Sequence, residues 1–303
     1  MRLHQTVVAT DMTNEHHQHD LSSNRIGTVF ILNLVFTLIE FVGGLLTNST
    51  AIMADAIHDL GDTLSIGFAW LLNKLSQKQT DEEFTYGYFR FSLLAALING
   101  LVLVIGSIWI LSESIPRLTN PEMPHAAGMF WLAVLGVVVN GTAAWRLSAG
   151  KTQNERILNW HLLEDVLGWI AVLIVSICLM FFDWPILDPA LSIAFTLFIL
   201  INVLKNTYQT IKIFMQSVPD KKLLENIRRD LQSIEHVINT HHVHLWSLDG
   251  ERHVLTAHLE IDEHMSSQEQ AQIKQQVSRK LSKYSLSHTT IEIELPEELC
   301  RDS

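Results

Sequence analysis

The sequence predicts an α-helical membrane protein, in which six transmembrane helices precede a small cytosolic C-terminal domain of the α+β class. Its 303 residues are 48% hydrophobic and their mean hydropathy is +0.21, which is more apolar than a globular chain with a solvated surface allows. Long uncharged segments occupy the chain before Tyr208, whereas Lys, Glu, Gln and His dominate after Pro219. This change in composition marks the boundary between the two parts.

A transmembrane helix needs about 20 consecutive apolar residues to cross the hydrocarbon of a bilayer. Segments of this kind lie at Ile26–Leu46, Ala51–Leu72, Phe91–Leu111, Ala126–Leu147, Leu158–Phe182 and Pro189–Tyr208. The connection Thr47–Thr50 is short enough to make the first two an antiparallel pair, and Pro185 marks a similar corner between the last two. We expect a six-helix domain over residues 25–212, an N-terminal segment over residues 1–24 and a C-terminal domain over residues 213–303.

Basic residues indicate the orientation of these helices, because Lys and Arg gather in cytoplasmic loops. The N-terminal segment is polar and has no signal peptide, so the amino end is expected to stay inside the cell. With six crossings, Arg117 is then the only basic residue in an outside loop. The inside segments carry Arg25, Lys74, Lys78, Arg90, Arg146, Lys151, Arg156, Lys205 and Lys212. The pattern predicts a multi-pass protein of the cell inner membrane with both termini cytoplasmic.

The C-terminal part shows the periodicities of two helices and three strands. Apolar residues recur at helical spacing over Leu223–Ile234 and again over Ile273–Leu281. Strand-like segments lie at His241–Leu248, Val254–Ile261 and Thr289–Leu295. The predicted order αββαβ is that of a ferredoxin-like domain.

Charge and motifs exclude several classes of function. A net charge of −11 and a pI of about 5.7 argue against nucleic acid as a partner, since duplex binders concentrate Lys and Arg. Acidic chains attract cations instead. No GxxxxGK[ST] phosphate loop occurs, so an ATP-driven pump is excluded and transport would draw on an ion gradient. The two cysteines, Cys178 and Cys300, match no CxxC metal spacing.

The informative residues are acids within the second predicted span, where Asp55, His58, Asp59 and Asp62 interrupt an apolar segment. Each buried Asp opposes membrane insertion by roughly 2.5–3.5 kcal/mol, so three unpaired acids would cost about 7–10 kcal/mol. Neither this span nor the fifth contains a basic residue that could neutralise them. Another compensating group is therefore required.

A matching group opens the fifth span, so that two spans carry the pattern HxxxD. Residues four apart lie on one helix face with Cβ atoms about 5–6 Å apart, which pairs His58 with Asp62 and His161 with Asp165. If the two faces meet, two imidazoles and two carboxylates can surround one cation tetrahedrally, as zinc prefers. The alternative is that these groups are helix-end residues solvated at the interfaces.

Two further acids of the second span have open roles. Asp55 lies one turn before His58 on nearly the same face, so it could relay protons or steer cations. Asp59 is rotated about 100° from His58, and both an indirect role behind the metal ligands and a purely structural role fit it.

These residues and their surroundings resemble the cation diffusion facilitator family of zinc transporters. The resemblance is carried by Asn48–Asp62 (NSTAIMADAIHDLGD), by Tyr86–Arg90 with Asn99-Gly100, and by His161–Asp165. It implies a homodimer in the lipid bilayer that exchanges cytosolic Zn²⁺ for external protons at a site of the two His and Asp pairs. His58 and Asp62 resemble the His–Asp pair that zinc-preferring members of this family carry on the second span.

The resemblance also implies metal ligands in the cytosolic domain, where zinc would regulate transport. His241, His244, His258 and His288 match the family's motifs. On a regular strand His242 and His244 share a face and His241 points away, so a site with both His241 and His244 requires an irregular backbone. The alternative is that these histidines only decorate a polar strand face.

Other classes of function leave distinct signatures. An intramembrane metal enzyme could use such ligands to activate water, but no HExxH motif occurs, so we expect no enzymatic activity. A metal sensor without transport would need only the cytosolic histidines. The residue types leave Zn, Cd, Co, Ni and Fe open as substrates. A zinc-collecting role for His16, His17 and His19 stays equally open.

Overall fold

The computed structural model describes residues 27, 30–76, 80–148, 153–262, 265–298 and 300, without the side chains of residues 70, 73, 74, 76, 146, 147, 153–159 and 161. The N-terminal segment of residues 1–24, with His16, His17 and His19, lies outside the described residues, and so does the side chain of His161. The chain divides into two compact units. The helical unit is Met1–Gln77 with Ala95–Thr207, and the C-terminal unit is Lys78–Leu94 with Tyr208–Ser303.

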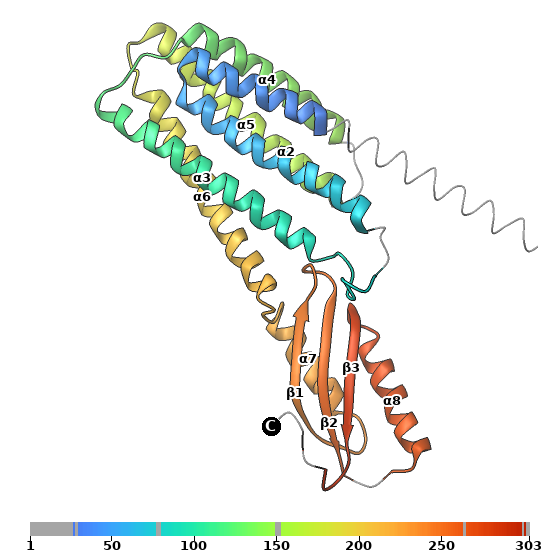
Figure 1. Cartoon of the computed structure of the whole chain (residues 1–303). Helices are drawn as coiled ribbons and strands as arrows, with labels where there is room; N and C mark the ends of the chain where they lie inside the picture. The colour runs from blue at the N-terminus through green and yellow to red at the C-terminus, as the bar shows by residue number, and fades with distance from the viewer. Residues whose placement is uncertain are drawn as a thin grey trace, which may run out of the picture. The chain divides into compact units, whose positions relative to one another are not determined.

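Long helices account for nearly all of the helical unit (Figure 1). A first helix, described over Phe30–Thr47, is followed by α2 (Thr50–Ser76), α3 (Phe91–Thr119), α4 (Ala126–Leu147), α5 (Gln153–Phe181) and α6 (Leu187–Phe214). Five of these are long and apolar enough to cross a membrane. The exception is α2, which is 27 residues long but carries the three aspartates that interrupt its apolar sequence.

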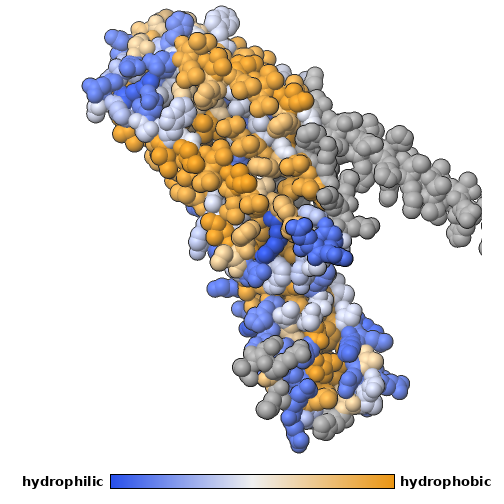
Figure 2. Space-filling model, viewed as in Figure 1, coloured by the Kyte–Doolittle hydropathy of each residue, from blue (hydrophilic) through white to orange (hydrophobic). Residues whose placement is uncertain are grey.

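The surface of the helical unit has the character expected of a protein in lipid. Figure 2 shows hydrophobic residues gathered over the visible face of its helices. Large apolar side chains such as Leu46, Trp131, Trp145 and Leu167 are more than half exposed. A water-soluble protein rarely exposes so many apolar side chains together. The predicted helical membrane domain is confirmed.

Helix ends differ from the predicted span ends where polar residues extend a helix. α3 continues to Thr119 instead of ending at Leu111, and it includes Pro116. The extra turns are polar and carry an ion pair of 2.7 Å between Arg117 and Glu113, four residues apart. Hydropathy locates the apolar part of a helix, whereas backbone hydrogen bonds continue beyond it.

The start of α2 is fixed by an acid from another helix. Asp188, in the first turn of α6, is buried and accepts hydrogen bonds from the Ser49 hydroxyl (2.5 Å), the Thr50 amide (2.7 Å) and the Thr50 hydroxyl (2.9 Å). A helix N-terminus presents unpaired amides and positive potential, which a carboxylate satisfies. Asn48 precedes it with a φ of 53°, a conformation that Asn tolerates. This cap anchors the helix that carries His58.

Close packing fixes α5 against α4. Trp169 of α5 is buried over Gly136 of α4, where a Cβ would lie 2.1 Å from the indole. Only glycine allows this approach, which presses the two helices together. The Trp169 ring also meets Phe36 of the first helix edge to face, with centroids 6.3 Å apart.

The C-terminal unit has the predicted αββαβ order. Its elements are α7 (Lys221–Gln232), β1 (Val237–Ser247), β2 (His253–Ile261), α8 (Ser267–Leu281) and β3 (Leu286–Glu294). The sheet order is β1-β2-β3, with β1 antiparallel and β3 parallel to β2. Apolar faces of α7 and α8 share a buried cluster with the inward side chains of the strands.

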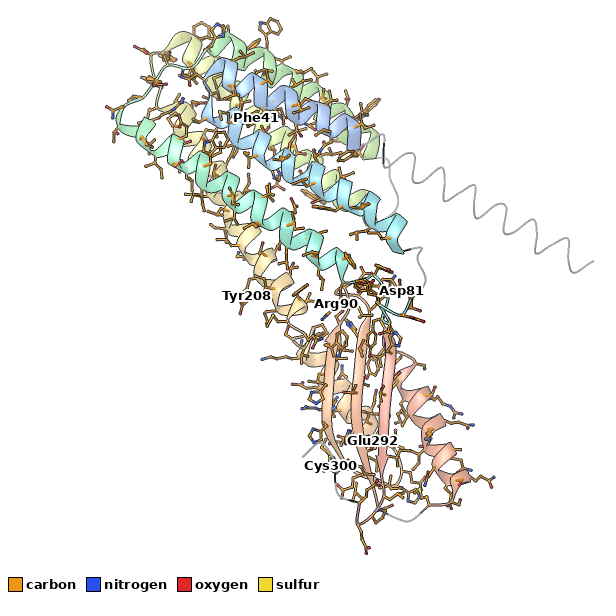
Figure 3. The ribbon with its side chains drawn as sticks, viewed as in Figure 1. Phe41, Asp81, Arg90, Tyr208, Glu292 and Cys300 are labelled. Atoms are coloured by element: carbon orange, nitrogen blue, oxygen red, sulfur yellow. The ribbon has the colours of Figure 1, made fainter. Side chains whose placement is uncertain are left out.

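The loop before α3 belongs to the C-terminal unit. Asp81 accepts hydrogen bonds from the amides of Glu83 and Phe84, and the Tyr88 hydroxyl donates to it at 2.5 Å. This bond to Asp81 raises the pKa of Tyr88 above its ordinary value. Tyr86 packs edge to face on Trp246 of β1, with centroids 5.7 Å apart. The loop is therefore folded onto one end of the sheet, where Figure 3 labels Asp81 and Arg90.

Candidate metal centres

In the helical unit, His58 lies between two acids from different helices. Its Nε2 atom is 3.8 Å from Oδ2 of Asp62, one turn further along α2. The same atom is 3.8 Å from Oδ1 of Asp165 on α5. Two ligands of one tetrahedral zinc, with bonds of about 2.1 Å, are about 3.4 Å apart. These separations are therefore close to those of a shared cation.

The fourth predicted ligand is His161, whose side chain is outside the described residues. Its backbone lies one turn before Asp165 on α5, so His161 and Asp165 share a helix face. The side chains of His58, Asp62 and Asp165 are 23%, 29% and 11% exposed, respectively. The site is thus neither sealed nor open.

A cavity gives access to this group. It has a volume of about 230 Å³ and is lined by Asp55, His58, Glu164, Asp165, Leu167, Gly168, Phe195, Phe198 and Ile199. Its acids and imidazole come from α2 and α5, and its apolar wall comes largely from α6.

Three further acids are buried in the same unit. Asp55 and Asp59 of α2 are 8% and 7% exposed. Glu40, on the first helix, is 1% exposed and was not anticipated from the sequence. The sequence does mark this residue, because Glu40 is the only charged residue between Phe30 and Thr47. However, Glu40 has no histidine or acid four residues away, and the other acids were identified by that spacing.

A second group of potential ligands forms in the C-terminal unit, on β1, β2, β3 and the segment that follows β3. Ligand atoms of His241, His258, Glu294 and Cys300 all lie within 4.8 Å of one another. Figure 3 labels Cys300 beside the sheet, near Glu292. Two imidazoles, a carboxylate and a thiol are a donor set that suits zinc and related metals.

A β-bulge makes this group possible. The pairing of β1 with β2 shifts register between His241 and His244, as it also does earlier between Val237 and Asn239, and His242 has a φ of 45°. The bulge turns His241 toward β2, so that its ring is 5.4 Å from that of His258 and 5.2 Å from that of His242. The irregular backbone that a site with His241 requires is present.

Short contacts hold the group together. His258 Nδ1 is 2.7 Å from Oε1 of Glu294 and 3.5 Å from Sγ of Cys300. His241 Nε2 is 3.0 Å from Oε2 of Glu294. His258 and His241 thus approach opposite oxygens of the same carboxylate.

The electrostatics keep Glu294 ionised. Burial raises the pKa of Glu294, but hydrogen bonds from His258 and Cys300, together with the charge and hydrogen bond of His241, outweigh it and hold the pKa below its ordinary value. Metal ligation requires a deprotonated carboxylate. The site is thus prepared for a cation at neutral pH.

Two predicted ligands lie outside this group. His244 is exposed on β1, beyond the bulge and opposite Thr256. His288 packs against Tyr86, with ring centroids 4.8 Å apart. Glu294 and Cys300 were missed by sequence reasoning. The family resemblance drew attention to His288, and Cys300 has no second cysteine near it to suggest a metal motif.

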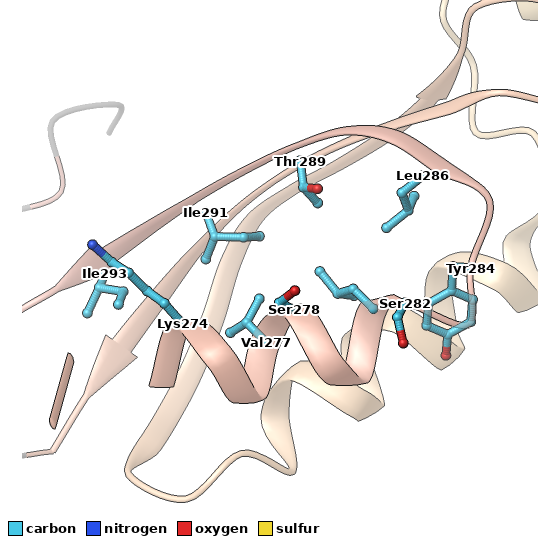
Figure 4. Close-up of a pocket in the computed structure, with 10 residues that line it drawn as sticks. Lys274, Val277, Ser278, Ser282, Tyr284, Leu286, Thr289, Ile291 and Ile293 are labelled. Carbon is cyan, nitrogen blue, oxygen red and sulfur yellow. The ribbon is translucent and has the colours of Figure 1, made fainter. Parts of the chain in front are cut away.

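A groove on the other edge of the sheet is unsuited to a cation. It lies between α8 and β3, has a volume of about 390 Å³, and is lined by apolar and hydroxyl side chains with Lys274 at one end (Figure 4). None of its lining residues is an acid, a histidine or a cysteine. The described candidates for metal binding are therefore the two groups above.

Comparison with known proteins agrees with the division of the chain into a helical unit and a C-terminal unit. A family model for the cation efflux transmembrane domain matches residues 27–215, and one for the cation efflux protein cytoplasmic domain matches residues 219–296. A cadmium, cobalt and zinc/H(+)-K(+) antiporter of Bacillus subtilis is 32% identical over 92% of this chain and 91% of its own length. Zinc transporter ZitB of Escherichia coli is 31% identical over 93% and 90%. Metal cation efflux system protein CzcD of Cupriavidus metallidurans is 29% identical over 92% and 89%.

Proposed function

The chain belongs to the cation efflux family, the cation diffusion facilitators, and from this premise we propose that it exports zinc and similar divalent cations in exchange for protons. The observation that carries the proposal is the position of His58, 3.8 Å from both Asp62 and Asp165 beside a cavity. The relatives named above are a zinc transporter, a cation efflux protein and an antiporter, in agreement with this activity.

Exchange follows from the chemistry of the ligands. Zinc binds neutral imidazole and ionised carboxylate, so metal and protons compete for His58, Asp62, His161 and Asp165. Cytosolic zinc displaces protons from these groups. When movement of the helices exposes the site to the outside, protonation of the same groups releases the metal.

The membrane arrangement completes the proposal. The basic loops predict an inner-membrane protein with both termini in the cytoplasm, which places the C-terminal unit on the cytosolic side. The family model that matches this unit is named for a dimer, which supports a homodimer.

The test is zinc flux into proteoliposomes that contain a zinc dye, with and without an imposed pH gradient. We expect gradient-dependent flux in the native chain and its loss in Asp62→Ala. Asp183→Ala is the matched control, because this exposed acid lies in the turn between α5 and α6. Undiminished flux in Asp62→Ala would contradict the site, and flux without the gradient would contradict the coupling.

A second role is favoured by the group His241, His258, Glu294 and Cys300. We propose that it binds regulatory zinc in the cytosol, because its ligands contact one another and belong to the C-terminal unit, whereas the transport site belongs to the helical unit. The double variant His241→Ala/His258→Ala should shift the zinc concentration that activates transport without abolishing flux at high zinc. An unchanged activation curve would count against this role.

A further inference from the structure

The first helix contains a buried acid that the metal site does not use. Glu40 is 1% exposed, and its carboxylate accepts no hydrogen bond from a conventional donor among the described residues; the group within hydrogen-bonding reach is another acid, Asp59 of α2. One oxygen of Asp55, also on α2, is likewise buried without a described donor. Buried carboxylates normally accept hydrogen bonds from donors, so an acid that faces another acid requires an explanation.

The charged groups that act on Glu40 are acids. Asp59 and Asp55 of α2 and Asp165 of α5 act on it electrostatically, and within the described part of the chain no basic group does so. Its neighbours in the first helix pack on apolar side chains, Phe41 on Trp109 of α3 and Gly43 on Leu132 of α4. An ionised Glu40 would therefore be a buried charge that faces further negative charges, which is strongly unfavourable.

Either a proton on Glu40 or a nearby cation removes the repulsion between Glu40 and the neighbouring acids. During the exchange of metal for protons, the proton and the cation would take this role in turn. Without metal, a proton on Glu40 neutralises it. When a divalent cation lies between His58, Asp62 and Asp165, its positive charge offsets that of Asp165 and stabilises an ionised Glu40. Metal binding and protonation of Glu40 are then linked through space, and each opposes the other.

We propose that Glu40 carries an exchanged proton at a position separate from the metal ligands. The inference rests on the proposed exchange of metal for protons. When zinc binds, the O–H bond of Glu40 breaks, its electron pair stays on the carboxylate, and the proton leaves to water. Asp55 lines the cavity and also acts on Glu40, so we assign to Asp55 the route of this proton to the cavity.

The test measures zinc affinity against pH in full-length protein that carries His258→Ala, which removes the cytosolic group. Glu40→Gln keeps the shape of the protonated acid and cannot release a proton. We expect its zinc affinity to equal that of the parent at acidic pH and to increase less steeply as the pH rises. The difference in slope should correspond to about one released proton fewer per zinc. Titration calorimetry in buffers of different ionisation enthalpy should show the same loss of about one released proton.

Two controls separate the outcomes. Glu40→Asp retains a carboxyl group and should keep the native pH dependence. An unchanged slope in Glu40→Gln, or a slope lost in Glu40→Asp, would overturn the proposal. An affinity lowered by one factor at every pH would also overturn it, because Glu40 would then support the metal directly. Asp62→Asn tests the proposed function itself, since zinc binding retained in that variant would refute the metal site whatever Glu40 does.

Discussion

The two candidate metal centres of this chain contain similar side chains in different surroundings. In the helical unit Nε2 of His58 is 3.8 Å from an oxygen of Asp62 and 3.8 Å from an oxygen of Asp165, and these side chains are 11–29% exposed beside a cavity. In the C-terminal unit His258 and Glu294 are 2.7 Å apart and their side chains are 9% and 7% exposed. Loose ligands beside a cavity suit a cation that must leave, whereas enclosed ligands suit one that stays. Surroundings therefore assign roles that residue types alone leave open.

The largest expected effect tests the position of ligands in the helical unit. Asp165→Ala removes a carboxylate from the cation, and we expect zinc flux to fall by at least about 100-fold, since even groups that only support metal ligands contribute 10- to 100-fold. Glu164→Ala is the control, because Glu164 lines the same cavity on the same helix and is not one of the proposed ligands. Its flux should fall only a few-fold. Equal losses in both variants would mean that the whole cavity, not one ligand set, binds the cation.

The next effect concerns the enclosed group. Cys300→Ser replaces a thiolate ligand, and we expect the affinity of the cytosolic site to fall by about 10- to 100-fold while flux at saturating zinc is retained. Cobalt is the probe, because a thiolate bound to Co²⁺ produces a charge-transfer band in the near ultraviolet. Cys178→Ser, within α5, should leave this band unchanged. A band that survives in Cys300→Ser would exclude Cys300 as a ligand.

The helical fold and much of the site in the helical unit were predictable from the sequence. The apolar segments located the helices, and HxxxD on two of them predicted which side chains meet at His58, because helix geometry fixes residues four apart. The C-terminal group was only partly predictable. Regular strand alternation places His241 and His244 on opposite faces of the sheet. The bulge at His242 changes the direction of the His241 side chain, and no local sequence pattern predicted this bulge.

Residues distant in sequence were the hardest to predict. Glu294 and Cys300 join His241 and His258 through strand pairing and through the path of the chain after β3, neither of which periodicity encodes. Glu40 was missed for a related reason. A single acid in an apolar helix forms no spacing pattern, and its meaning appears only when α2 and α5 bring other acids beside it.

A smaller effect is expected from pH on the enclosed group. The pKa of Glu294 is lowered in the folded chain, so its contribution to stability is complete above the ordinary Glu value of about 4.3 and disappears as the pH falls through the lowered value. In metal-free protein, Glu294→Gln should destabilise the C-terminal unit by about 1 kcal/mol at neutral pH and by almost nothing at strongly acid pH.

Thermal unfolding of the full-length protein with a chelator measures this difference. Glu251→Gln is the control, since Glu251 is exposed in the β1–β2 turn and should show no such dependence. A constant difference between native protein and Glu294→Gln at all pH values would mean that the carboxylate charge does not hold the group together.

The smallest expected effect asks whether the C-terminal unit can signal to the helices at all. Tyr86 packs on Trp246 and His288, and the Arg90 guanidinium lies 5.1 Å from the centre of the Trp246 ring. These contacts fix the loop that continues into α3 onto the same strand that carries His241. Tyr86→Ala should weaken the loop by about 0.5 kcal/mol and accelerate hydrogen exchange over residues 80–90. Tyr208→Ala is the control, since the Tyr208 ring is largely exposed and its removal should leave this exchange unchanged.

The two outcomes have different meanings. If Tyr86→Ala frees the loop and zinc still activates transport normally, regulation does not pass through this contact. If activation is lost while cytosolic zinc remains bound, the loop is the connection between the two centres.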